Sequence, residues 1–191
     1  MRRSSAVLKS ALACLAIFAC ARATTLQKLS LDDMIRQSTG IVRARVTGSR
    51  GALRGRNIYT YYRLQVLETA KSDPALAGNH NGRHEIEVAV PGGSANGMHE
   101  AAIGSPELAA GSEYVVFLWT GKSGLTQIIG LSQGLFRVTR NATGDLNLSR
   151  PAADEPMLDR AGHRVADQPA ELHWSQVRSR IQRDLSGEPR E

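Results

Sequence analysis

The chain of 191 residues carries 24 basic and 18 acidic side chains and only two cysteines, Cys14 and Cys20. Four of the basic residues and both cysteines fall within the first 23 residues, which contain no acid. Removing that segment leaves a net charge of +2 instead of +6 and no thiol. Because it has no cysteine, the remaining chain cannot contain a disulfide framework, a cysteine nucleophile or a cysteine-ligated metal.

Residues 1–23 have the pattern of a secretory signal peptide. A basic start is followed by an apolar core at 11–19 and by the small-x-small sequence Ala21-Arg22-Ala23. We expect cleavage after Ala23 and a periplasmic or secreted protein, because this core is shorter than the roughly 20 residues of a membrane span. The alternative is a lipoprotein anchored at Cys20, because residues 17–20 are compatible with a lipid-attachment site.

The first half of the remaining chain predicts one short helix and three strands. An N-cap residue and two early acids predict a helix at 30–37. Alternating apolar residues predict strands at 41–47, 58–68 and 84–90. Glycine, proline and asparagine predict a turn region at 49–57, a loop at 71–83 with one helical turn at 74–77, and a turn at 91–93.

The second half centres on the strongest strand signal of the chain. Residues 114–119 are apolar on both alternating faces, as in a central strand, and strands at 125–129 and 135–138 are expected to flank it. A long connection, 94–112, precedes this group, and long connections often carry function. Leu146 and Leu148 indicate an added edge strand.

The C-terminal part differs in composition. Residues 151–169 form a charged, proline-containing stretch with little to bury. Trp174, Val177, Ile181 and Leu185 then recur at helical spacing, which predicts an amphipathic helix that docks on the barrel or binds a partner. We expect a β-barrel domain at 24–149, a linker at 150–171, and a C-terminal helix and tail at 172–191.

Three motifs with catalytic or ligand-binding precedents have simpler explanations. Gly130-Leu131-Ser132-Gln133-Gly134 matches G-x-S-x-G, but a strand rather than a helix is predicted after Ser132, which argues against a serine esterase with Asp145 and His163. The spacing of His80 and His84 would place both side chains on one face, where they could bind a metal ion, only in a helix. A turn is predicted there instead. Pro91-Gly92-Gly93 lacks the lysine and the helix of a phosphate-binding loop.

A basic stretch is the most informative surface feature. Seven arginines and no acid lie between Asp33 and Glu68, and the outward face of strand 58–68 adds tyrosines. Arginines interleaved with aromatic side chains on a small barrel can bind nucleic acid or sugar chains; the alternative is a solvated strand face. The candidate binding residues are Arg43, Arg45, Arg54, Arg56, Tyr59, Tyr61 and Arg63.

Five segments resemble a family of secreted bacterial domains of uncharacterised function. They are SLDDMIRQSTGIVRARV, TYYRLQVLETAK, VPGG, GSEYVVFL and GLSQGLFRV, which together span residues 30–138. The family has an oligonucleotide/oligosaccharide-binding (OB)-type barrel and is loosely similar to the barrel of tissue inhibitors of metalloproteinases. Such domains usually have a glycine where this chain has Ser72 and an aromatic residue where it has Leu108. The resemblance implies no catalytic residues.

These observations predict an all-β protein: a small OB-like barrel of five or six strands with a short N-terminal and an amphipathic C-terminal helix. We expect a monomeric, non-enzymatic binding or accessory module that acts on another exported protein, such as a protease, without a cofactor or metal. Inhibition in the metalloproteinase-inhibitor manner is disfavoured, because that mode uses an N-terminal cysteine and this chain would begin at Thr24. The alternative function is binding of an anionic polymer.

Overall fold

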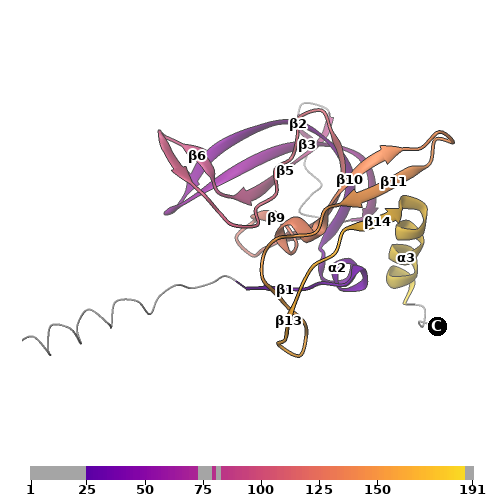
Figure 1. Cartoon of the computed structure of the whole chain (residues 1–191). Coiled ribbons are helices and arrows are strands. Elements are labelled where there is room, and N and C mark those ends of the chain that lie inside the picture. Colours follow the sequence, from indigo (N-terminus) through magenta and orange to yellow (C-terminus); the bar gives the residue numbers. More distant parts are fainter. Residues whose placement is uncertain (1–24, 73–78, 81–82, 188–191) are drawn as a thin grey trace, which may run out of the picture.

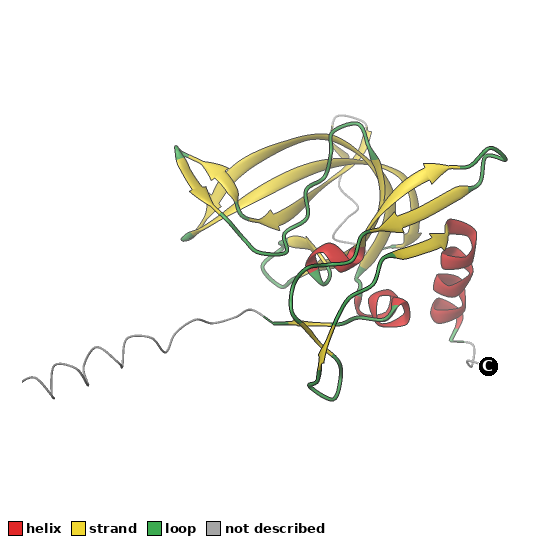
Figure 2. Ribbon diagram, viewed as in Figure 1, coloured by secondary structure: helices red, strands yellow, loops and turns green. Residues whose placement is uncertain are grey.

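A computed structural model describes residues 25–72, 79–80 and 83–187, and within them strands predominate over helices (Figures 1 and 2). The helices are α2 (Leu31–Gln37), α3 (Trp174–Ser186) and the short 3₁₀ helix η3 (Leu131–Gly134). The strands are β1 (Leu26–Gln27), β2 (Gly40–Arg54), β3 (Asn57–Lys71), β4 (Asn79–His80), β5 (Arg83–Pro91), β6 (Gly93–Ala95), β7 (Met98–Glu100), β8 (Glu113–Thr120), β9 (Thr126–Ile128), β10 (Leu135–Arg140), β11 (Leu146–Arg150), β12 (Met157–Leu158), β13 (Arg164–Val165) and β14 (Ala170–His173).

The largest sheet is antiparallel and contains nine strands. Its order is β14-β11-β10-β8-β2-β3-β5-β4, with β9 paired to β8. Strand β8 lies in the middle, and its residues 114–118 are buried on both faces, as the apolar run 114–119 predicts. The predicted central strand is therefore confirmed. The predicted edge strand corresponds to β11, but β11 is not an edge because β14 pairs along its free side.

The predicted turn region at 49–57 is wrong, because strand β2 continues through it to Arg54. Only Gly55 and Arg56 separate β2 from β3, and Gly55 has the positive φ of 64° that suits such a tight turn. Register shifts near residues 41, 43 and 46 interrupt the pairing of the two long strands. Bulges of this kind bend a ribbon, and Figure 1 shows the β2–β3 hairpin curving across the whole molecule.

The prediction of a mostly β protein with a short N-terminal helix and a C-terminal helix is confirmed, but the barrel of five or six strands is not: the structure has more strands and the barrel is not closed. Strands β5 and β9 lie beside each other, with Cα atoms within 8 Å, but no strand pairing joins them. The sheet wraps around most of a barrel-like core and leaves this seam unpaired. Sequence patterns predict strands, whereas closure depends on register and shear, which local alternation does not specify.

Two apolar cores lie on opposite faces of β8. One fills the concave side and includes Val116, Leu118 and Leu64. The other lies on the helix side, where Phe117 contacts Phe136 at 5.8 Å between ring centroids and packs with residues of α2 and α3. Both helices lie on this side of the sheet (Figure 1). Helix α2 begins with the predicted cap, because the Ser30 side chain accepts from the Asp33 backbone N–H.

The C-terminal helix docks on the sheet instead of standing free. Trp174, Val177 and Ile181 are buried, whereas Leu185 of the predicted apolar face is 57% exposed. The Trp174 indole N–H donates to Glu68 on β3 at 3.0 Å, and Arg178 pairs with the same carboxylate at 3.2 Å. Docking is one of the two roles that the amphipathic pattern predicted.

The segment 151–169, predicted to be a linker with little to bury, contributes to the fold. Strands β12 and β13 form a small sheet with β1, and Met157 is completely buried. Asp167 forms a buried ion pair with Arg150. Burial raises the pKa of Asp167, but hydrogen bonds from Arg150 and from backbone N–H groups outweigh this effect and lower the pKa to about 2. The segment therefore joins the second half of the chain to its N-terminal strand.

Several predictions fall outside the described residues. These are the signal peptide and its cleavage site, the alternative anchor at Cys20 and the helical turn at 74–77. The predicted strands at 41–47, 58–68, 84–90, 125–129 and 135–138 correspond to β2, β3, β5, β9 and β10, whereas the predicted loop at 71–83 contains β4 and the start of β5.

Candidate functional site

The first two candidate arginines are held in ion pairs within the fold. Arg43 contacts Glu68 at 3.2 Å and Glu113 at 3.1 Å, and only 15% of its side chain is exposed. Arg45 contacts the second oxygen of Glu113 at 2.6 Å. Burial raises the pKa of Glu113, but hydrogen bonds and the charges of both arginines outweigh it, so its pKa lies below the usual range. The basic face is therefore partly neutralised at this end.

Further along the hairpin, a tyrosine and an arginine stack on each other. The Arg50 guanidinium lies 4.6 Å from the ring centroid of Tyr61 and makes two 2.9 Å contacts with Glu87. Tyr59 is the aromatic neighbour of Tyr61, at 6.2 Å between centroids. Because Tyr61 is only 9% exposed, little of its ring is accessible for stacking on a ligand.

The remaining candidates lie at the tip and on the outward face of the hairpin. Arg54 donates to the backbone carbonyl of Ser123 at 2.9 Å. Among the described residues, neither Arg56 nor Arg63 has an ion-pair partner, and both are exposed. Arg43 and Arg54 are eleven positions apart on one strand, about 35 Å at 3.3 Å per residue. The structure therefore places the seven candidates along an extended ribbon and not in one patch.

The G-x-S-x-G stretch forms a turn between two strands. Gly130 and Leu131 have positive φ values of 61° and 55°, and η3 is followed directly by β10. Asp145 accepts from Thr143 and Asn141 in its own turn, and His163 contacts Asp159. In the described ranges, no set of three or more His, Cys, Asp or Glu side chains has metal-binding geometry.

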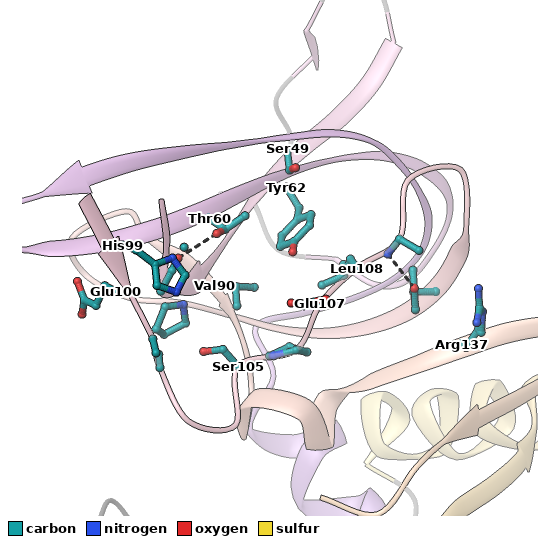
Figure 3. A pocket seen from close by; sticks show the side chains of 18 residues that line it. Ser49, Thr60, Tyr62, Val90, His99, Glu100, Ser105, Glu107, Leu108 and Arg137 are labelled. Carbon is teal, nitrogen blue, oxygen red and sulfur yellow. Dashed lines mark hydrogen bonds between the residues drawn. The ribbon is translucent and has the colours of Figure 1, made fainter. Parts of the chain in front are cut away.

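A cavity of about 600 Å³, open to solvent, lies on the concave side of the sheet (Figure 3). Its wall includes the corner Pro91-Gly92-Gly93, β7 and the connection 101–109. Gly92 and Gly93 have φ values of 87° and 121°, and a Cβ on Gly93 would lie 2.2 Å from the Thr60 hydroxyl oxygen. The Thr60 hydroxyl donates a hydrogen bond to the Gly92 carbonyl at 2.9 Å. Glycine at this corner allows the wall to approach β3.

The cavity contains polar groups that the fold does not use. Tyr62 points from β3 into it (Figure 3) and is only 8% exposed, yet its hydroxyl has no hydrogen-bond partner among the described residues. Ser105 also lines the cavity, but its hydroxyl oxygen is itself buried and has no partner among the described residues. The Tyr62 hydroxyl is not one of the buried unpaired atoms, so it is open to the cavity. Because it makes no hydrogen bond to a described residue, it is the candidate for a ligand contact.

The two ends of the cavity carry opposite charges. Figure 3 shows His99 and Glu100 at one end and Arg137 at the other, with a second acid of the lining, Glu107, between them. One Glu100 oxygen accepts from the Ile58 backbone N–H at 2.6 Å, and Arg137 contacts the Ser112 hydroxyl at 3.1 Å. Neither group forms an ion pair with another described residue. The arrangement combines hydroxyl groups with one acidic and one basic end, which suits a ligand that is not uniformly charged.

The sequence indicated this region only indirectly. The long connection 94–112 was noted as a type of segment that often carries function, and Pro91-Gly92-Gly93 was expected to be a turn. Tyr62 was not among the candidate binding residues, which included Tyr59 and Tyr61 of the same strand. The grouping of Tyr62, Ser105 and Arg137 requires three segments that are distant in sequence, so no local motif could reveal it.

No protein-family model, curated protein or solved structure matches the chain in the three comparisons made with known proteins. None of the helices in the described part of the chain is both long enough and apolar enough to span a membrane.

Proposed function

We propose that this protein is an exported, monomeric, non-enzymatic binding or accessory module that acts on another extracytoplasmic protein, in the periplasm or outside the cell. The observation that carries the proposal is the cavity on the concave side of the sheet, with the Tyr62 hydroxyl inside it and without an internal partner. Its volume of about 600 Å³ lies within the usual range for ligand sites. The resemblance to secreted OB-type domains agrees with a role in binding.

Binding of an anionic polymer by the basic face has weaker support. Three of the arginines that suggested it, Arg43, Arg45 and Arg50, contact carboxylates of the same chain. A polyanion would have to displace these carboxylates, and it would meet the charges of Glu68, Glu113 and Glu87 beside its phosphates. Arg56 and Arg63 alone offer few of the contacts on which nucleic-acid affinity depends.

Photo-crosslinking in the producing organism tests the proposal. A photoreactive amino acid at Ile103, which is 86% exposed and lies between the cavity-lining residues Ala102 and Ser105, should give a discrete adduct with one exported protein. The same amino acid at Leu185, on the distant C-terminal helix, is the matched control and should not give that adduct. Adducts with nucleic acid or polysaccharide alone, or no Ile103-dependent adduct, would contradict the proposal.

A further inference from the structure

The cavity differs from an apolar pocket in the groups that line it. Tyr62 is more than nine-tenths buried, and its hydroxyl faces the cavity without a partner. The unpartnered Ser105 hydroxyl oxygen is itself buried, so the Tyr62 hydroxyl is the one open to a ligand. It can both donate and accept a hydrogen bond, so it suits an amide group of a ligand.

The backbone of the cavity wall is also incompletely paired. Between residues 103 and 108, the only backbone–backbone hydrogen bond to a described residue runs from the Ser105 N–H to the Ala102 carbonyl, at 3.2 Å. The segment has no strand partner in the described part of the chain. Residues 105–108 of this segment line the cavity, and unpaired main-chain groups there can hydrogen-bond an extended peptide, as the unpaired edge of a sheet does.

The charges narrow the ligand class further. Glu100 and Arg137 lie at opposite ends of the cavity, Glu107 lies between them, and none of the three forms an ion pair with a described residue. A polyanion would be repelled by Glu100 and Glu107. A polypeptide has an uncharged backbone and places charged side chains at chosen positions, so it can satisfy both ends.

We infer that the cavity binds an extended polypeptide segment of the partner, with the Tyr62 hydroxyl contacting its backbone and Arg137 contacting an acidic side chain. This inference rests on the proposed function and specifies where and how the partner is recognised. The Arg137 contact predicts a preference for aspartate or glutamate at one position of the segment.

The test uses the exported protein and a library of random dodecapeptides displayed on phage. The peptides enriched on wild type should share an acidic position, and their synthetic copies should bind in fluorescence anisotropy. Arg137→Ala should weaken binding about tenfold to a hundredfold and abolish the acidic preference, as expected for loss of a charged hydrogen bond. Tyr62→Phe should weaken it about threefold to tenfold, because it removes one neutral hydrogen bond.

Arg140→Ala is the matched control, because Arg140 lies on the same strand, is exposed and has no ion pair with a described residue. It should bind like wild type, and equal melting temperatures would show that all variants fold. Peptide binding unaffected by both cavity variants would place the site elsewhere and overturn this inference, but not the proposed function. No enriched peptide, or Tyr62-dependent binding of a glycan instead, would overturn the polypeptide assignment, and the Ile103 adduct tests the function independently.

Discussion

Glu113→Gln is the most informative substitution on the basic face, because Glu113 forms ion pairs with two arginines. One oxygen contacts Arg43 at 3.1 Å and the other contacts Arg45 at 2.6 Å. Glutamine is nearly the same size, so the change removes the charge and leaves the shape. Arg43 then has Glu68 as its only remaining ion-pair partner among the described residues.

The expected cost follows from burial. Arg43 and Glu113 are only 15% and 19% exposed, so their hydrogen bond is a charged one in a partly buried site, worth about 1.5–3 kcal/mol. Arg45 is 47% exposed, and its contact contributes at most about 1 kcal/mol. The total, about 1.5–4 kcal/mol, corresponds to a melting temperature about 3–16 °C lower for a chain of this size.

Thermal unfolding followed by circular dichroism measures this effect, and heparin chromatography measures the freed charge. Glu113→Gln should elute from heparin at higher salt than wild type, because Arg43 and Arg45 lose the carboxylate that neutralises them. Glu171→Gln changes the net charge equally at an exposed site without an ion pair to a described residue, and should leave both properties near wild type. A melting temperature for Glu113→Gln within about 1 °C of wild type would refute the ion-pair argument.

Three further outcomes are expected. Phe117→Ala removes a fully buried ring from the helix-side core and should cost about 3–5 kcal/mol in a denaturant titration; an unchanged midpoint would show that β8 is not central. The pKa of Asp167 is about 2 in the folded protein, below its ordinary value of 3.8, so its contribution to stability is present above about pH 4 and is lost as the pH falls towards 2. In Asp167→Asn the melting temperature should therefore fall less steeply with pH in that range than in wild type. An equally steep fall in both proteins would contradict the lowered pKa of Asp167. Mass spectrometry of the exported protein should show a chain that starts at Thr24, whereas a diacylglyceryl mass on Cys20 would establish the lipoprotein alternative.

The sequence was most informative where local chemistry decides the structure. The apolar run 114–119 predicted a strand buried on both faces, and Ser30 with its following acids predicted the start of α2. The spacing of Trp174, Val177 and Ile181 predicted the buried face of α3. Each of these signals lies within a few residues of the feature that it predicts.

The sequence was least informative where distant segments meet. No acid lies between Asp33 and Glu68, so the arginines in that range looked unpaired. Their partners Glu113 and Glu87 come from β8 and β5, which pair with the hairpin across the sheet. The length of β2 was underestimated because Gly48 and Gly51 resemble turn residues. Gly51 instead permits close packing, since a Cβ there would lie 1.8 Å from the Ser94 carbonyl oxygen.

The most direct measurement is a calorimetric titration of the exported protein with the partner that the Ile103 adduct identifies, at 50 mM and 200 mM salt. Binding through the cavity predicts saturable one-to-one association in which affinity changes less than about tenfold between the two salt concentrations, and which weakens in Arg137→Ala. A polyanion site with six to ten phosphate contacts would instead lose roughly 10³–10⁵ in affinity over that range. No association with the partner, or such a steep salt dependence together with full binding by Arg137→Ala, would contradict a protein-binding module that acts through this cavity.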